Sequence, residues 1–171
     1  MIRYVAFLRG ISPMNCKMPH LKRCFEAAGF AEVRTVLSSG NVAFSARPAI
    51  VPVLEKKAED AMGKHLGRTF QTIVRPASFL QSLVDSDRFA EFDLPTNAKR
   101  IITFLRRPPE GRIELPISRD HASILKLEGT EVLSAYVPGE KGPVFMELLE
   151  RTFGAEITTR TVDTVRRCSV A

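Results

Sequence analysis

The order in which short β-prone runs alternate with amphipathic helical stretches constrains this chain more than any other feature. An apolar strand is expected at residues 3–8, because both of its faces are apolar, as in a strand covered on both sides. The order strand, helix, strand, strand, helix, strand is the split-βαβ or ferredoxin-like arrangement, which places two helices on one face of a four-stranded antiparallel sheet. The later elements are expected at residues 18–28, 33–37, 42–45, 48–66 and 69–74.

The same pattern restarts in the second half of the chain. Residues 110–115 are expected to form a shrunken first helix, and a basic helix ends the chain. The pentapeptide ending at Arg9 is echoed by the one ending at Arg106, and the hairpin glycines Gly40 and Gly129 fall at equivalent places. We therefore predict an α+β protein of two tandem ferredoxin-like units. The expected parts are residues 1–76, a connector with a short helix at 77–98, and residues 99–171.

Periodicity also predicts the core. One buried stripe on the first helix is expected to meet the long helix and the strands, with a large loss of stability on replacing Phe25 by alanine. Glu55, Glu59 and Asp60 are expected on the solvated face of the long helix. The residues expected to be buried together are Val5, Phe7, Leu21, Phe25, Phe44, Leu54, Ala58 and Ile73.

The composition excludes several classes of protein. Apolar residues make up 44% and charged residues 26%, as in ordinary globular proteins. No apolar run approaches the roughly 20 residues of a membrane-spanning helix. Arg3 and Arg9 interrupt the N-terminal apolar run, unlike the pattern of a signal peptide, and three widely spaced cysteines argue against a disulfide framework. We therefore expect a cytoplasmic protein without a membrane partner, and a monomer is favoured.

The net charge of +6 is concentrated near the N-terminus. Residues 1–47 hold seven Lys and Arg against two Glu, a net of +5, whereas residues 48–98 have a net of −1 and residues 99–171 a net of +2. A basic N-terminal third attracts phosphates or another acidic partner. The competing interpretation is a solvated surface, because +6 is modest for a nucleic-acid binder.

A set of motifs covers most of the chain and is most specific in its first half. These motifs comprise Tyr4 to Ile11, Lys17, Met18, Leu21, Gly29, Phe30, Val33 to Thr35, Ser39 to Val42, Phe44, Arg75 and Thr159 to Arg166. They resemble the signature of a bacterial family, domain of unknown function 1697. The resemblance implies a small two-part α/β protein and supplies no chemistry. It is weaker at the C-terminus, where the usual Arg-Asn-Trp-Asn-Thr-Val reads Arg160-Thr-Val-Asp-Thr-Val165 and the usual basic stretch reads Glu140-Lys-Gly-Pro-Val144.

The predicted topology collects anion-compatible side chains at one edge of the first sheet. We expect strands one, two and four to run in the same direction, so that the ends of strands one and four lie beside the start of the first helix and the hairpin turn. Guanidinium and ammonium groups with turn hydroxyls beside a helix N-terminus form anion sites. The predicted ligand-binding residues are Arg9, Asn15, Lys17, Ser39, Asn41 and Arg75.

Three functions follow from this edge. The first is a binding module for a nucleotide, a phosphorylated small molecule or a nucleic acid around Arg9. The second is an enzyme acting on a small anionic substrate, although no general base stands beside the cations, so whether there is catalysis is open. The third is a structural or protein-interaction domain, since the Ser-Gly-Asn turn is also ordinary hairpin chemistry and Arg9 can pair with Glu26 or Glu32.

Thiol and cofactor chemistry receive little support. Cys16, His20 and Cys24 are spaced at four-residue steps, but Pro19 breaks the helical register and a fourth zinc ligand is missing. A reactive Cys16, with its pKa lowered by Lys17 and the helix N-terminus, is an alternative. The sequence has no Walker loop and no Gly-x-Gly-x-x-Gly. We expect no metal and no cofactor.

Overall fold

The computed structural model describes residues 1–139 and 144–171. Of the stretch that departs from the family pattern, residues 140–144, all but Val144 lie outside this part. Over the described residues the protein is α+β, with two antiparallel sheets and five helices. The prediction of an α+β protein with antiparallel sheets is therefore confirmed. No helix among the described residues is long and apolar enough to cross a membrane.

The chain divides into two compact units, which are described separately below. The first unit comprises Met1–Asp85 together with Arg166–Ala171, and the second comprises Ser86–Val165. Residues 77–85, expected in the connector, thus group with the first unit. The last residues of the basic C-terminal helix α5 (Val162–Ser169) also group with it.

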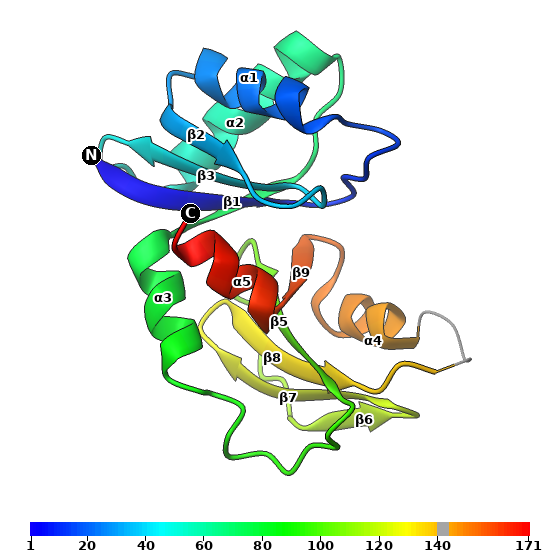
Figure 1. Cartoon of the computed structure of the whole chain (residues 1–171). Coiled ribbons are helices and arrows are strands. Elements are labelled where there is room, and N and C mark those ends of the chain that lie inside the picture. The colour runs from blue at the N-terminus through cyan, green and yellow to red at the C-terminus, as the bar shows by residue number, and fades with distance from the viewer. Residues whose placement is uncertain (140–143) are drawn as a thin grey trace. The chain divides into compact units, whose positions relative to one another are not determined.

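The first unit has one four-stranded sheet with two helices on one face (Figure 1). The strand order is β2-β3-β1-β4, and every neighbouring pair is antiparallel. A third helix, α3, contacts β1 and β4. The elements are β1 (Ile2–Leu8), α1 (Met18–Ala27), β2 (Ala31–Thr35), β3 (Asn41–Ala46), α2 (Val51–Leu66), β4 (Thr72–Pro76) and α3 (Ala77–Asp85).

The expected direction of the fourth strand is wrong. A strand that follows a helical crossover runs in the same direction as the strand before the helix, so β2 runs with β1 and β4 runs with β3. The β2–β3 hairpin reverses the chain between these two crossovers. As a result, β4 runs antiparallel to β1. In the observed register Leu8 lies opposite Thr72, and Val5 lies opposite Arg75. The start of β4 is therefore beside the end of β1, where the Arg9 N–H donates to the carbonyl of Gln71 at 2.9 Å.

The core of the first unit lies between the sheet and helices α1 and α2. Phe44 is its aromatic centre, with ring centroids 5.7 Å from Tyr4, 5.7 Å from Phe25 and 4.2 Å from Phe30. All eight predicted core residues are buried. They do not form one cluster, because successive residues of a strand point to opposite faces of the sheet. The cluster under the helices holds Leu21, Phe25, Phe44, Leu54 and Ala58 but not Val5, Phe7 or Ile73.

Glu55 was expected on the solvated face of the long helix, and that expectation is wrong. Its side chain is only 2% exposed, and its carboxylate accepts a hydrogen bond from the backbone N–H of Val74 at 3.0 Å. Since β4 is an edge strand of its sheet, this N–H has no neighbouring strand to bond. Glu55 thus satisfies a backbone donor at the sheet edge.

Replacing Glu55 by alanine should lower the free energy of unfolding by about 1.5–3 kcal/mol, because the N–H of Val74 loses a charged acceptor. Urea denaturation measures the change. Asp60→Ala is the matched control, since Asp60 is an exposed carboxylate on the same helix and pairs with Lys56. Its loss should be much smaller. Equal losses in the two variants would contradict the role assigned to Glu55.

The second unit repeats the strand order of the first around its own sheet. The order is β6-β7-β8-β5-β9, so the four strands β7, β8, β5 and β9 correspond to β2, β3, β1 and β4. The expected helical turn at residues 110–115 is absent, and the short edge strand β6 follows that stretch instead. Helix α4 covers one face of this sheet (Figure 1). The elements are β5 (Lys99–Leu105), β6 (Ile117–Arg119), β7 (Ala122–Glu128), β8 (Glu131–Tyr136), α4 (Val144–Phe153) and β9 (Ile157–Thr161).

Candidate functional site

The end of β1 and the β2–β3 hairpin meet in the first unit, as the sequence predicted. The N–H of Leu8 donates to the carbonyl of Gly40 at 2.8 Å. Gly40 has a φ of +86°, and a Cβ there would lie 3.0 Å from the Cβ of Ile11 and 3.2 Å from that of Leu8. Only glycine fits this conformation and this close approach. The hairpin is thereby held against the loop that follows β1.

Two of the predicted ligand residues use their amides within the protein. The side chain of Asn15 donates to the carbonyl of Gly10 at 2.8 Å and accepts from the N–H of Ser12 at 2.9 Å, so it closes the loop after β1. Asn41 is buried, and its amide donates to the carbonyl of Val36 and to the hydroxyl of Ser39. These bonds order the loop and the turn.

A pocket of about 310 Å³ lies beside that loop, and we call it the loop pocket. It brings together residues from the loop, the first turn of α1 and the connection from α2 to β4. Lys17, at the N-cap position of α1, makes no side-chain capping bond. Arg68 lies over the ring of Phe70, 4.5 Å from its centroid. The lining residues are Pro13, Met14, Asn15, Cys16, Lys17, His20, Leu66, Arg68 and Phe70.

A second pocket of about 440 Å³, the helix pocket, adjoins the loop pocket between α1 and the end of α2. The two pockets share His20 and Leu66. The lining residues of the helix pocket are His20, Arg23, Cys24, Ala27, His65 and Leu66.

The charge around the two pockets is of one sign. Their linings include five basic side chains, those of Lys17, His20, Arg23, His65 and Arg68, and no carboxylate. Within the described part of the chain, none of the five forms an ion pair. Such an arrangement favours an anion, helped by the positive end of α1.

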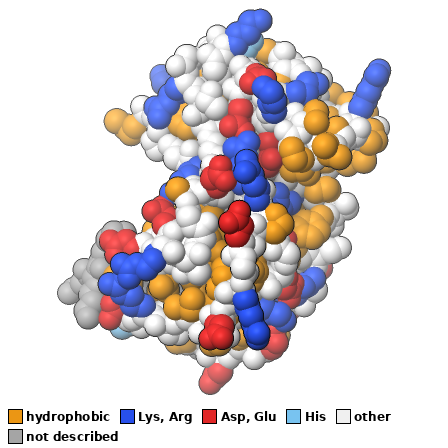
Figure 2. All heavy atoms as spheres, turned by 180° about the vertical axis from the view of Figure 1, so that it is seen from behind, with side chains coloured by type: hydrophobic (Ala, Val, Ile, Leu, Met, Phe, Trp, Pro, Cys, Tyr) orange, Lys and Arg blue, Asp and Glu red, His pale blue; other side chains and the backbone are white. Residues whose placement is uncertain are grey.

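Some basic side chains outside the two pockets are paired with acids. Lys22 pairs with Glu26 on the outside of α1, and Lys56 pairs with Asp60 on α2. On the face shown in Figure 2, Lys and Arg side chains are interspersed with Asp and Glu. What distinguishes the two pockets is that several basic side chains gather there and no carboxylate lines them.

Cys16 is not the activated thiol considered from the sequence. Burial raises the pKa of the Cys16 thiol, and the nearby Arg68 guanidinium offsets this only in part. Burial likewise raises the pKa of Cys24. Neither thiol is poised as a nucleophile, because the thiolate is the reactive form. Among the described residues, no group of three or more His, Cys, Asp or Glu side chains is placed to hold a metal ion.

Iodoacetamide should therefore label Cys16 of the folded protein at pH 8 several-fold more slowly than it labels glutathione. The raised pKa keeps the thiol protonated, and burial limits access. Site-resolved mass spectrometry of timed samples measures the rate. Protein unfolded in guanidinium is the control and should react as fast as glutathione. Native Cys16 reacting at the glutathione rate would contradict the prediction.

The structure gathers only part of the predicted site. Asn15 and Lys17 line the loop pocket, but Arg9, Ser39 and Asn41 are not among its lining residues. Arg75 is buried opposite Val5, four residues along β1 from Arg9, and its guanidinium donates to the carbonyl of Val74 at 2.9 Å. The expectation that Arg75 converges with Arg9 is wrong, because β4 runs antiparallel to β1.

Two basic residues of the loop pocket, His20 and Arg68, were not among the predicted anion ligands, and His20 was considered only as a metal ligand. Arg68 follows the left-handed cap Gly67 of α2, and a strand then leads from the same end of the helix into the sheet. A cation directly after a helix-ending glycine lies at the helix end, so the sequence contains this signal. The wrong direction expected for the fourth strand placed Arg75 at this edge instead.

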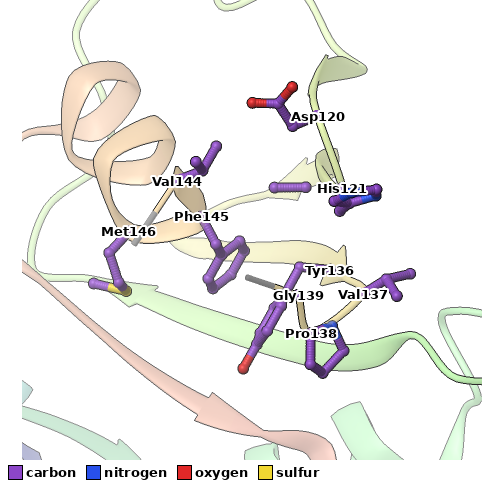
Figure 3. Close-up of a pocket in the computed structure, with 10 residues that line it drawn as sticks. Asp120, His121, Tyr136, Val137, Pro138, Gly139, Val144, Phe145 and Met146 are labelled. Atoms are coloured by element: carbon purple, nitrogen blue, oxygen red, sulfur yellow. The ribbon is translucent and has the colours of Figure 1, made fainter. Parts of the chain in front are cut away.

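The second unit contains a pocket of a different kind, with a volume of about 270 Å³ (Figure 3). Its floor is aromatic, since the rings of Tyr136 and Phe145 stack with centroids 4.7 Å apart. Asp120 and His121, in the turn between β6 and β7, contribute polar groups at its rim. This lining suits an apolar or planar group better than an anion. In the sequence, the feature that corresponds to this pocket is the pair of aromatic residues Tyr136 and Phe145, one at the end of β8 and the other at the start of α4.

The fold and the site define an α+β protein with a basic pocket in its N-terminal unit. The chain belongs to the family described as "Protein of unknown function (DUF1697)", which matches residues 1–132 and confirms the resemblance seen in the sequence. The altered motif at residues 160–165 lies beyond the matched range, whereas both basic pockets lie within it.

One solved structure is similar over the whole chain. It is described as "The structure of conserved bacterial protein SP0830 from Streptococcus pneumoniae", with a TM-score of 0.67 and 18% sequence identity. The similarity covers 99% of this chain and 97% of that one. At this identity it supports the fold and carries no function. No curated protein matches the chain.

Proposed function

We propose that this protein binds a phosphate-bearing ligand and that a phosphate group occupies the loop pocket. One observation carries the proposal: Lys17, His20 and Arg68 line this pocket without any carboxylate. Ammonium and guanidinium groups form charge-assisted hydrogen bonds with phosphate oxygens, and guanidinium does so in a bidentate manner. Lys17 and His20 come from the start of α1 and Arg68 from the residues after α2, so the pocket is lined by basic side chains from two elements.

The loop after β1 gives this site its shape. Asn15 holds the loop closed through its bonds to Gly10 and Ser12, which positions Lys17 at the start of α1. In the proposed site Lys17 contacts the ligand, and Asn15 is a positioning residue. The Ser39–Asn41 turn of the neighbouring hairpin is held at the start of this loop by the hydrogen bond from Leu8 to Gly40, beside Arg9. The proposed site leaves out Arg75, whose backbone lies opposite Val5, four residues along β1 from Arg9.

We also propose that both units are forms of one ferredoxin-like βαββαβ unit. The shared order of four strands supports this, as do two equivalent hydrogen bonds after the first strand of each unit. Leu8 and Arg9 donate to Gly40 and Gln71, while Leu105 and Arg106 donate to Thr130 and Glu156. In the second unit the first helix has been lost. An experimental structure whose two sheets fail to superpose over the four strands would contradict the duplication.

A thermal-shift screen tests the binding proposal. Inorganic phosphate, adenosine monophosphate, sugar phosphates and a short oligonucleotide are added to the protein at low salt, since a ligand that binds only the folded state raises the melting temperature. At least one phosphate compound should raise it, and the shift should shrink as salt is added. Unphosphorylated counterparts such as adenosine serve as controls. No shift with any phosphate compound would overturn the proposal.

A further inference from the structure

Basic side chains follow one row along α1 and connect the two pockets. Lys17, His20 and Arg23 succeed one another at three-residue steps, which places them as neighbours on the helix surface. Lys17 lines the loop pocket, Arg23 lines the helix pocket, and His20 lines both. The row spans about 9 Å of helix, from the rise of 1.5 Å per residue.

The end of α2 supplies a second row of basic groups opposite the first. Arg68 belongs to the loop pocket and His65 to the helix pocket, with Leu66 shared between them. Each pocket is thus lined by basic side chains from both helix ends, and the apolar side chain of Leu66 lines both pockets. A row of this length has room for two phosphate groups, one at each end.

We propose that the ligand is a small molecule carrying two separated phosphate groups, one bound in each pocket. This rests on the proposed function of the loop pocket and adds the helix pocket to it. Linking two anionic groups in one molecule makes the second contact intramolecular, so the pair binds more tightly than either group alone. Leu66 provides an apolar surface for the part of the ligand that joins the phosphates.

A small molecule fits this site better than a nucleic-acid strand. Pockets of about 310 and 440 Å³ are in the range of small-molecule sites. Proteins that bind single strands stack the bases on exposed aromatic rings. The one Phe among the lining residues of the two pockets, Phe70, is buried and covered by Arg68.

Calorimetry with a matched pair of probes tests the inference. Fructose 1,6-bisphosphate and fructose 6-phosphate differ by one phosphate, and the first should bind wild-type protein at least about tenfold more tightly. The helix-pocket variant Arg23→Gln/His65→Gln should lose this advantage and bind both probes alike. The loop-pocket variant Arg68→Gln should bind both probes more weakly. Lys22→Ala, on the same helix but outside both pockets, should behave as wild type.

The outcomes separate this inference from the proposed function. Equal affinity of the two probes, with binding still dependent on Arg68, would overturn the two-phosphate ligand and leave the loop pocket as a single-phosphate site. Absence of binding by both probes, by pyrophosphate and by inorganic phosphate would overturn both proposals. Tighter binding of a thymidine hexanucleotide than of the bisphosphate would overturn the small-molecule class. All variants replace exposed side chains, and their melting temperatures serve to check folding.

Discussion

Replacing Phe44 by alanine should lower the free energy of unfolding by about 3–5 kcal/mol, the usual cost of removing a buried phenylalanine. The ring of Phe44 is fully buried and packs against Tyr4, Phe25 and Phe30. Alanine at this position of β3 would leave a cavity beneath the helices, and the three aromatic rings would border it. No single neighbour can fill such a cavity without leaving its own packing. Chemical denaturation followed by circular dichroism measures the loss.

The matched control for this variant is Phe79→Ala on α3. The side chain of Phe79 is 40% exposed, so the same chemical change should cost less than about 1 kcal/mol. A loss below about 1 kcal/mol for Phe44→Ala would mean that the aromatic cluster does not stabilise the first unit. A loss as large for Phe79→Ala would show that the effect is not specific to the core.

The second large effect is expected on binding. The double variant Lys17→Ala/Arg68→Gln should lower the affinity for a phosphate ligand found by the thermal-shift screen at least about a hundredfold. Each charge-assisted contact contributes about 1.5–3 kcal/mol, so two contacts account for this factor. The dependence of affinity on salt should also become weaker, because fewer cations face the ligand. Isothermal titration calorimetry at two salt concentrations gives both quantities.

A control with the same change in net charge separates local contacts from long-range attraction. Lys22→Ala/Arg47→Gln removes two exposed cations of the first unit that line neither pocket. Its affinity should stay within about threefold of wild type at moderate salt, because exposed charges that do not contact the ligand are largely screened. Equal losses in the two double variants would mean that binding reflects net charge and not the loop pocket.

Periodicity was sufficient to predict most of the first unit. Apolar residues at helical spacing predicted α1 and α2, and β-branched and aromatic runs around Gly40 predicted the β2–β3 hairpin. These signals are local, since each depends on residues within one element or one turn. The predicted meeting of the hairpin with the end of β1 was also correct. Two short segments and one glycine determine that contact.

The remaining features depend on relations between distant segments. The direction of β4 follows from the connections before it, and the error there misplaced Arg75. The burial of Glu55 depends on an edge-strand N–H nineteen residues away, which helical periodicity does not register. Residues 110–115 contain no clear apolar stripe, so periodicity alone could not decide whether a helix forms there. The basic pockets are lined by residues of α1 and of the end of α2. The local sequence of neither helix indicates that these two segments lie side by side, so the pockets could not be predicted without the tertiary structure.

The most direct test of the central claim is a two-dimensional ¹H–¹⁵N NMR titration of the assigned protein with inorganic phosphate. If phosphate binds in the loop pocket, saturable shifts should concentrate in the backbone amides of residues 14–18, 20 and 66–70, which surround the side chains of Lys17, His20 and Arg68. Addition of chloride at equal ionic strength is the control and should leave these amides unchanged. Saturable shifts confined to other parts of the chain, or no saturable shift at all, would contradict the assignment of this pocket as a phosphate site.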